Sequence, residues 1–530
     1  MCGFAVAIGW PEADATVRAL IMGILHRGDV TDPLFSPLPN IAMCTRRLRI
    51  VDGEHGVQPQ ISFFGRLAVS FNGEIYNHAE LRQELQDLGV GFKTESDTEV
   101  LANALQAWGA RALERFNGMY AFVALDLVTG EFLAARDPFG VKPLYVMQKG
   151  TSYLFCSEMR PLLNSVPDCD VMVLPPGYAL SRKNCVRFKS PVYPRDDTAV
   201  DYSPRALDEI LCAAVERRLP PGLPVATFFS GGIDSTLVAH YARRFRPEAP
   251  GYFVGNTRAP DFRYAATYAE KTGYDLRIVP FDAQSEEAFA SIAEVVTATE
   301  SFEPNLIRGA VASHLAARAM HRDGFRVALC GEGADELFCG YAPLEIAFHE
   351  SAAAGQPVRD ECLSLMNRVS LQRVDRTSMR HSVETREPFL DPAVVNYALN
   401  LDASALVREV GGLATGKMPL RDIYGLYPDD LPVSIRDRAK VPFGEGAGLD
   451  TGKEGWTRRF EDAISDREFT EGKWEFDGFK LQSKEELYYL RKLAEAIDVA
   501  RVPHLRDRAW ISFPVQQHLE KLKAHAHFSL

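Results

Sequence analysis

The pattern of apolar residues changes once along this chain of 530 residues, and that change constrains the fold more than any other feature. Residues 1 to about 190 contain short apolar runs bounded by turn residues, such as 67–71, which are typical of strands. From residue 205 predicted strands and helices alternate, beginning with a strand over 223–229 and a helix over 235–243. Such alternation predicts a parallel sheet covered by helices.

The length of the chain also predicts more than one domain, because a single core rarely exceeds 250–300 residues. The segment 191–204 is polar and rich in proline, as linkers often are. We therefore expect one domain over 2–190, a linker over 191–204 and a second domain over 205–530.

Composition excludes several classes of function. Hydrophobic residues make up 46% of the chain and charged residues 25%, as in ordinary soluble proteins. A net charge of −12 argues against nucleic acid or a charged membrane surface as partner, because no positive field attracts phosphates. We find no apolar run near the roughly 20 residues that span a bilayer, and no secretory signal. The nine scattered cysteines favour reduced thiols and a cytoplasmic location.

Cys2 is the first candidate catalytic residue, because removal of Met1 would make it the N-terminus. The same residue would then carry a thiol nucleophile and a free α-amine that can act as its base. An α-amine has a pKa of about 7.7–8.0, so part of it is neutral near pH 7. A cysteine at this position can also be incidental, so the motifs that follow decide its meaning.

Four polar clusters recur in the first half of the chain. Taken singly they have simple interpretations: an Asn-Gly pair is a hairpin turn, and a Ser-Asp-Thr-Glu string is a helix cap. Together with Cys2 they resemble the class II glutamine amidotransferase domain, an N-terminal-nucleophile hydrolase, over residues 1–190. The clusters are Arg47-Leu48-Arg49-Ile50-Val51, Asn72-Gly73-Glu74-Ile75-Tyr76-Asn77, Ser96-Asp97-Thr98-Glu99 and Arg136-Asp137-Pro138-Phe139-Gly140.

This resemblance implies a glutamine site. Arg47 would pair with the α-carboxylate of glutamine, and Asp97 would take its α-ammonium group. The Asn72 side chain and the Gly73 backbone N–H would stabilise the oxyanion formed when the thiolate of Cys2 attacks the side-chain amide. The expected glutamine-binding set is Arg47, Leu48, Arg49, Ile50, Val51, Asn72, Gly73, Glu74 and Asp97.

One position departs from this family pattern. Family members usually have a proline after His-Arg-Gly, whereas His26-Arg27-Gly28 is followed here by Asp29. We expect this change to alter a loop of the glutamine site without removing the site.

A glycine-rich segment, Phe229-Ser230-Gly231-Gly232-Ile233-Asp234-Ser235, lies between a predicted strand and a predicted helix. Such a turn presents unpaired N–H groups and the positive end of a helix dipole to phosphate. It is neither a Walker A motif, since no lysine follows the glycines, nor GxGxxG. The segment resembles the SGGxDS loop of ATP pyrophosphatases, which cleave ATP to AMP and pyrophosphate.

An acidic segment, Gly331-Glu332-Gly333-Ala334-Asp335-Glu336, follows the strand predicted over 325–330. Carboxylates at the carboxyl end of a strand suit the ligand crevice of an open α/β sheet, although a solvated acidic loop would be the simpler interpretation. The segment resembles GEGSDE of asparagine synthetase, and the match continues through Arg308, 379–391 and Lys440. The whole chain resembles a glutamine-dependent asparagine synthetase.

The resemblance assigns roles in the second half as well. Asp234 and Asp335 would bind Mg²⁺, and Arg308 with Asp335 would hold the acceptor. Glu332 would take a proton from attacking ammonia, and Lys440 would neutralise charge on the reacting groups. The expected ATP-binding set is Phe229, Ser230, Gly231, Gly232, Asp234, Ser235, Val254, Cys330 and Gly331.

The implied fold is an N-terminal αββα sandwich followed by an α/β parallel-sheet domain with a helical C-terminal part. The implied reaction converts aspartate, glutamine and ATP into asparagine, glutamate, AMP and pyrophosphate through an acyl-adenylate. Ammonia would pass between the two sites inside the protein. The sequence leaves open whether two copies of the chain form a homodimer.

Departures near the second site leave the acceptor carboxylate open. Two threonines that precede the matching arginine in the family are Asn305 and Leu306 here. A site that loses a polar partner for its substrate can change specificity strongly, so a different carboxylate acceptor is the alternative. Further departures replace Ser, Ser and Gly of the family pattern by Cys330, Ala334 and Cys339.

Two other interpretations account for part of the sequence. Beta-lactam synthetases share the ATP-using half but have lost the terminal cysteine, which this chain keeps, and that argues for external ammonia. A regulatory protein with only a glutaminase half is the third interpretation. It is disfavoured by the presence of Asp234, Glu332, Asp335 and Lys440.

Overall fold

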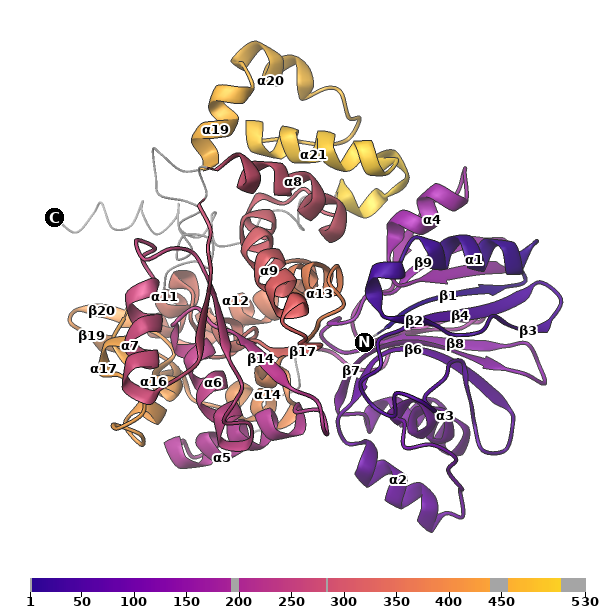
Figure 1. The fold of residues 1–530 in the computed structure, drawn as a ribbon, viewed down its shortest axis with the longest axis horizontal. Helices are drawn as coiled ribbons and strands as arrows, with labels where there is room; N and C mark the ends of the chain where they lie inside the picture. The colour runs from indigo at the N-terminus through magenta and orange to yellow at the C-terminus, as the bar shows by residue number, and fades with distance from the viewer. Residues whose placement is uncertain (1, 192–199, 283–284, 439–455, 507–530) are drawn as a thin grey trace.

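The structure is a computed structural model that describes residues 2–191, 200–282, 285–438 and 456–506. In these residues a sandwich of two antiparallel sheets is followed by a parallel sheet packed with helices (Figure 1). The expected fold class is confirmed. Residues 192–199 of the expected linker lie outside the described residues, and the domain bounds stay a prediction.

The first sheet holds Cys2 near its centre. Its strand β1 pairs antiparallel with β4, so that Cys2 lies directly opposite Arg47. All seven residues of β1 are buried, because the sheet is covered on both faces. In spatial order the strands are β11 (Met172–Val173), β9 (Tyr145–Lys149), β10 (Ser152–Cys156), β1 (Cys2–Ile8), β4 (Ile41–Arg47) and β2 (Val30–Thr31), with β3 (Phe35–Leu38) also paired to β4.

The second sheet packs against the first and carries Asn72 and Gly73. These two residues lie inside β6, paired with β7, so the interpretation of this pair as a hairpin turn is wrong. In spatial order the strands are β13 (Cys185–Arg187), β12 (Tyr178–Leu180), β8 (Phe132–Arg136), β7 (Gly118–Asp126), β6 (Leu67–Ile75) and β5 (Gln60–Ile61).

Helices cover the two outer faces of the sandwich (Figure 1). α1 (Ala13–Met22) and α4 (Met159–Ser165) pack on the first sheet, and α2 (His78–Asp87) and α3 (Asp97–Trp108) pack on the second. A separate apolar cluster fills the space between the sheets. As the Ser-Asp-Thr-Glu string indicates, Ser96 caps α3 by accepting a hydrogen bond from the Thr98 N–H at 3.2 Å.

The second half is built on a five-stranded parallel sheet. In spatial order its strands are β16 (Leu276–Val279), β15 (Gly251–Val254), β14 (Val225–Phe228), β17 (Val327–Leu329) and β18 (Glu384–Arg386). The chain leaves β14 toward β15 on one side and later places β17 on its other side. The strand order therefore reverses between β14 and β17, which is where open α/β sheets bind their ligands.

Helices cover both faces of this sheet. α9 packs on one face, and α5 and α6 lie on the other. The main helices of this half are α5 (Pro204–Arg217), α6 (Ile233–Phe245), α7 (Phe262–Thr272), α8 (Glu286–Thr299), α9 (Pro304–Arg322), α11 (Ala342–Glu350), α12 (Ala352–Leu365), α13 (Ser370–Met379), α14 (Pro392–Leu399), α16 (Met418–Tyr424), α19 (Trp456–Ala463), α20 (Asp466–Gly472) and α21 (Lys484–Ala496). Shorter elements are α10 (Ala334–Leu337), α15 (Ala403–Leu406), α17 (Val433–Arg436) and the hairpin of β19 (Arg408–Val410) and β20 (Leu413–Thr415).

One apolar cluster runs through both halves of the molecule. It joins α1, α4 and the outer face of the first sheet to the parallel sheet and to α8, α9 and α21. A second cluster joins Tyr76 and Phe139 of the sandwich to helices of the second half. Within the described residues no helix is long and apolar enough to cross a membrane, and the nine cysteines form no disulfide.

The halves also meet through buried charges. Arg386 of β18 donates to Glu74 of β6 at 2.8 Å and to Glu384 at 2.5 Å, and all three side chains are almost fully buried. A second network joins Arg27 of the sandwich to Asp375 of α13 at 3.0 Å. The sequence pattern did not predict β18, because Glu-Thr-Arg lacks the apolar residues that usually mark a buried strand.

Replacing Arg386 by Met should destabilise the protein by about 3–5 kcal/mol, because two buried carboxylates would lose their shared cation. The matched control is Arg326→Met, since Arg326 also bridges the halves, to Asp29 at 3.3 Å, but its side chain is 39% exposed. The control should cost only about 0–1 kcal/mol. Urea unfolding checks both variants, and equal midpoints would contradict the structural role given to Arg386.

Candidate active sites

The first candidate site surrounds Cys2. The backbone nitrogen of Cys2 donates to Asn72 Oδ1 at 3.0 Å, and the thiol lies 3.9 Å from Gln58 Nε2. Because the Asn72 carbonyl oxygen faces Cys2, its amide nitrogen is placed close by. That buried Nδ2 has no hydrogen-bond partner among the described residues. An unpaired buried donor beside a thiol is what an oxyanion hole requires before its substrate arrives.

Gly73 could not be replaced by a larger residue without a clash. Its φ is +155°, and a Cβ atom there would lie 2.0 Å from the Met119 carbonyl oxygen. A glycine therefore allows β6 to approach β7 closely at the point where Asn72 faces Cys2.

Arg47 is held rigidly beside the nucleophile. Its Nε donates to Asp32 Oδ2 at 3.1 Å, and its Nη1 donates to the Gly53 carbonyl oxygen at 3.0 Å. Nη2 has no protein partner among the described residues. The guanidinium thus keeps one donor edge for a substrate carboxylate, and Asp32 fixes its orientation.

Asp97 begins α3, and its Oδ2 accepts the Ile75 N–H at 3.0 Å. The side chain is only 5% exposed, and burial raises the pKa of Asp97 to about 6. The charge of Glu384 also raises the pKa of Asp97. Burial, together with the charge of Asp97, raises the pKa of Glu74 to about 7. A carboxylate as deeply buried as Asp97 favours a cation beside it, such as an α-ammonium group.

The remaining residues of the predicted glutamine set have different surroundings. Leu48 is buried, whereas Ile50 and Val51 are half-buried. The Arg49 side chain is half-exposed and pairs with Asp29 at 3.0 Å. Glu74 is committed to Arg386 of the other half.

Asp29 replaces the proline of the family pattern, and the structure gives it two roles. Its backbone N–H donates to the Arg47 carbonyl oxygen at 2.9 Å, a bond that proline could not make. Its carboxylate pairs with Arg49 and Arg326. In this chain, ion pairs therefore hold the loop that contains Asp29 in place.

The thiol of Cys2 is not activated by its surroundings alone. Burial raises the pKa of the Cys2 thiol to about 11, and a hydrogen bond from the Leu48 backbone N–H and the charge of Arg47 offset this only in part. A neutral thiol at pH 7 needs a base to react. The Cys2 nitrogen, which becomes an α-amine once Met1 is removed, is the group that the sequence predicts for this task.

The second candidate site lies where the strand order of the parallel sheet reverses. The loop after β14 leads into α6, which begins at Ile233, and no side chain of the described residues caps its first turn. The Ser235 hydroxyl accepts the Ser230 N–H at 3.2 Å, and the Ser230 hydroxyl accepts the Gly232 N–H at 3.3 Å. The loop is therefore folded around its own hydroxyl groups, and the uncapped start of α6 is left for an anion.

Asp234 and Asp335 converge on one ammonium group. Lys417 Nζ lies 2.6 Å from Asp234 Oδ2 and 2.5 Å from Asp335 Oδ1, and Lys417 is only 4% exposed. Asp234 lies in the first turn of α6, which follows β14, and Asp335 lies in α10, which follows β17. The fold therefore brings together the pair that the sequence predicted. Gly340 makes the approach possible, since a Cβ there would lie 1.9 Å from Asp335 Oδ1.

Other residues of the expected ATP-binding set lie at the ends of neighbouring strands. Val254 ends β15, and Cys330 and Gly331 follow β17. The Phe229 side chain is buried and packs against the Tyr274 ring, with 5.1 Å between ring centroids, so only its backbone is left for a nucleotide.

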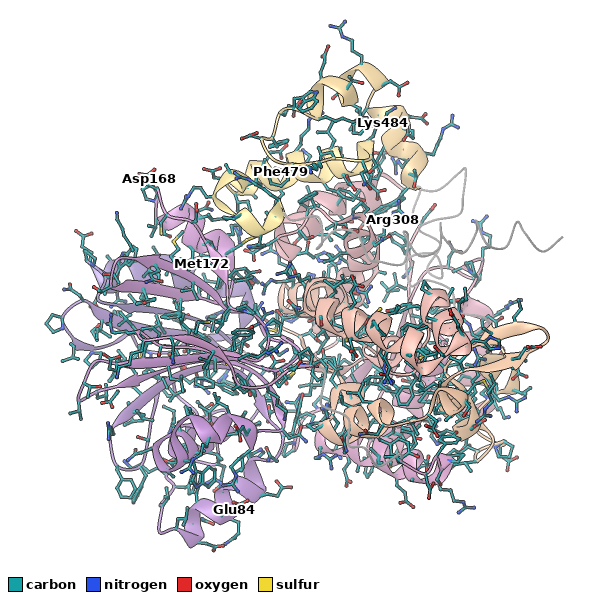
Figure 2. All side chains as sticks on the ribbon, turned by 180° about the vertical axis from the view of Figure 1, so that it is seen from behind. Glu84, Asp168, Met172, Arg308, Phe479 and Lys484 are labelled. Carbon is teal, nitrogen blue, oxygen red and sulfur yellow. The ribbon has the colours of Figure 1, made fainter. Side chains whose placement is uncertain are left out.

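Glu332 and Arg308 each have a protein partner. Arg373 of α13 makes an ion pair with Glu332. Arg308, seen beneath the C-terminal helices in Figure 2, donates through Nε to Glu485 Oε1 at 3.0 Å and through Nη2 to Glu485 Oε2 at 2.5 Å. Glu485 lies in the first turn of α21, the last α-helix of the described residues, so α21 covers the Arg308 side of the site.

The two substituted positions before Arg308 face in different directions. Asn305 is exposed, whereas Leu306 is fully buried in the apolar cluster of α8, α9 and α21. The Leu306 side chain therefore packs in the core, and the identity of the acceptor stays a prediction. Lys440 lies outside the described residues.

Two family models match the chain: a glutamine amidotransferase domain over residues 1–178, and asparagine synthase over residues 206–357 and 350–511. An asparagine synthetase (glutamine-hydrolysing) of Oryza sativa subsp. japonica is 30% identical over 478 residues, which cover 84% of this chain and 78% of the relative. A probable asparagine synthetase of Dictyostelium discoideum is 29% identical over 536 residues, 94% of each chain. The chain belongs to the asparagine synthetase family. The expected class of activity, a carbon–nitrogen ligase with a glutamine amidotransferase domain, is confirmed.

Sequence reasoning missed four residues of these sites in this asparagine synthetase family member. Gln58 contacts the thiol and Asp32 orients Arg47. Arg438 donates to the Gly231 carbonyl oxygen at 3.1 Å, and Lys417 joins the two aspartates. Gln58, Arg438 and Lys417 lie at least 56 residues from their partners, and Asp32 lies 15 residues from Arg47, so no local signal could have found them.

The affinity for glutamine should depend on the protonation of Asp97. A carboxylate with a pKa near 6 is ionised above that pH and loses its charge as the pH falls through it. We expect the KM for glutamine to rise about tenfold per pH unit below 6. Asp97→Asn should give a high KM that no longer changes with pH.

The control is Glu99→Gln, because Glu99 lies on the same helix but bonds backbone N–H groups at Lys93 and Thr94. Glutaminase assays between pH 5 and pH 8 make the comparison. A pH-dependent KM that persists in Asp97→Asn would reject the role of Asp97.

Lys417→Met should lower pyrophosphate release by about 10²–10³, the usual effect of removing one electrostatic partner of a reacting group. Glutamine hydrolysis should stay unchanged, because Cys2 lies in the other half. The control is Lys271→Met, since Lys271 of α7 contacts only the Pro428 carbonyl oxygen among the described residues. Pyrophosphate and glutamate are measured in the same reaction, and equal pyrophosphate rates in both variants would show that Lys417 has no part in the ATP reaction.

Proposed function

We propose that the protein takes ammonia from glutamine at the first site and joins it to an ATP-activated carboxylate at the second, with aspartate as the acceptor. The products would be asparagine, glutamate, AMP and pyrophosphate, formed through an acyl-adenylate. The observation that carries this proposal is the convergence of Asp234, Asp335 and Lys417 at the strand-order reversal, in the same chain as the Cys2–Asn72 site. A glutaminase alone would have no use for such a cluster.

At the first site Cys2 would attack the side-chain amide of glutamine. Its own α-amine, held by Asn72 Oδ1, would take the thiol proton, which the raised pKa of the thiol makes necessary. The unpaired Asn72 Nδ2 and the Gly73 N–H would bind the oxyanion. Ammonia leaves, and water then releases glutamate from the thioester.

At the second site the loop from Ser230 to Ser235 would bind the phosphates of ATP. Asp234 and Asp335 suit a divalent cation, because both carboxylates already point at one positive charge. Bound with ATP, Mg²⁺ would neutralise phosphate charge. Lys417 would hold the two carboxylates in place, and Lys440 would supply a further positive charge.

Aspartate is the leading acceptor, and one observation favours a different carboxylate. The bidentate ion pair between Arg308 and Glu485 already gives this guanidinium a carboxylate partner. An aspartate α-carboxylate would have to displace Glu485 or find another cation. A larger or tethered acceptor without a free α-carboxylate would avoid that competition.

A panel of carboxylates tests the proposal. Purified protein with ATP, Mg²⁺ and glutamine should release pyrophosphate and form asparagine when aspartate is present. Aspartate-independent activity with another carboxylate would select the alternative acceptor. Glutamine hydrolysis without pyrophosphate release from any acceptor would overturn the proposal.

Cys2→Ala separates the two half-reactions. This variant should lose glutamine-dependent synthesis and keep ammonia-dependent synthesis, because only the first site uses the thiol. Intact-mass measurement should show that Met1 is absent from the active protein. Equal loss with both nitrogen donors would reject the role of Cys2.

A further inference from the structure

Glu387 is a buried carboxylate that the proposed reaction does not use. It directly follows β18 and is 2% exposed. Among the described residues, the one side-chain donor that reaches its carboxylate is the thiol of Cys330, with 3.9 Å between Sγ and Oε1. A buried carboxylate with so weak a partner is costly, since buried charges are normally paired or fully hydrogen-bonded. Burial accordingly raises the pKa of Glu387 to about 7.

The cations that act electrostatically on Glu387 do not supply the missing partner. Lys142 is fully buried and acts electrostatically on Glu387, but its ammonium group is placed 3.4 Å from Asp375 Oδ1. Arg218 also acts on Glu387, but its guanidinium is bound to Asp391 at 2.9 Å. Glu387 therefore lies among cations that are held by other carboxylates.

Glu387 lies where the two halves of the chain meet. The preceding residue, Arg386, reaches Glu74 of β6, which follows the Gly73 predicted to bind the oxyanion. The thiol partner, Cys330, precedes Gly331 at the second site. One neighbour of Glu387 thus contacts the glutamine half, and its own side chain faces the ATP half.

We propose that Glu387 binds ammonia on its way from the first site to the second. The carboxyl group would accept an N–H hydrogen bond from the ammonia molecule, and no covalent bond would form or break. Ammonia is a small neutral molecule with three N–H groups, so it can supply the hydrogen-bond donor that the protein does not provide for the Glu387 carboxyl group. This assignment rests on the proposed function, which requires ammonia to cross the interface.

The test measures how many glutamates are released for each pyrophosphate in one reaction. Glu387→Leu keeps the size of the side chain but removes the acceptor, so ammonia should escape more often. We expect the ratio of glutamate to pyrophosphate to rise about fivefold, the scale of one lost hydrogen bond. Pyrophosphate release driven by saturating ammonium chloride and total glutamine hydrolysis should both match the native protein.

Two further variants keep the test decisive. Glu387→Gln retains an acceptor oxygen and should raise the ratio in the same direction by less, and it carries the test if the leucine variant does not fold. Asp208→Asn changes another buried carboxyl group, bound to Tyr241 at 2.7 Å and Tyr427 at 2.6 Å, and should leave the ratio unchanged.

The outcomes separate this assignment from the proposed function. An unchanged ratio in the Glu387 variants would overturn the assignment while native synthesis stands. Parallel loss of ammonia-driven synthesis would also overturn it, because Glu387 would then serve the ATP site itself. Native protein that releases glutamate but no pyrophosphate with any carboxylate would overturn the proposed function, and the assignment with it.

Discussion

The buried ion pair between Arg386 and Glu74 is the contact on which the arrangement of the two sites depends. A charge of this kind is expensive to bury and tolerates little displacement, since its partners must satisfy it in full. It joins the strand that carries Asn72 and Gly73 to the edge strand of the parallel sheet. The position of one site relative to the other is therefore set by a polar contact with strict geometry.

The same principle appears at smaller scale inside each site. Arg47 is oriented by Asp32, and Asp234 and Asp335 are brought together by Lys417. In each case a residue that would contact substrate is held by a charged partner from a distant segment. The sites are pre-organised, so binding energy is not used to assemble them.

The sequence predicted much of this structure, because regular spacing of apolar residues marks a strand or a helix within a short segment of the chain. α3 and β14 are examples, and so is the loop at Ser230. The polar strand β18 and the partners Asp32, Gln58 and Lys417 were not predictable, because their roles arise only when distant segments meet. The surroundings of Leu306 were not predictable either, since its place next to Arg308 in the sequence does not show that its side chain packs in the core.

The apolar cluster that runs from α1 and α4 into α8, α9 and α21 makes the folding of each half depend on the other half. Either half made alone would expose a broad apolar face, which isolated soluble proteins rarely tolerate. The two catalytic halves are thus one unit of folding. Exchanging either half with that of a relative would demand a matching face as well as a matching active site.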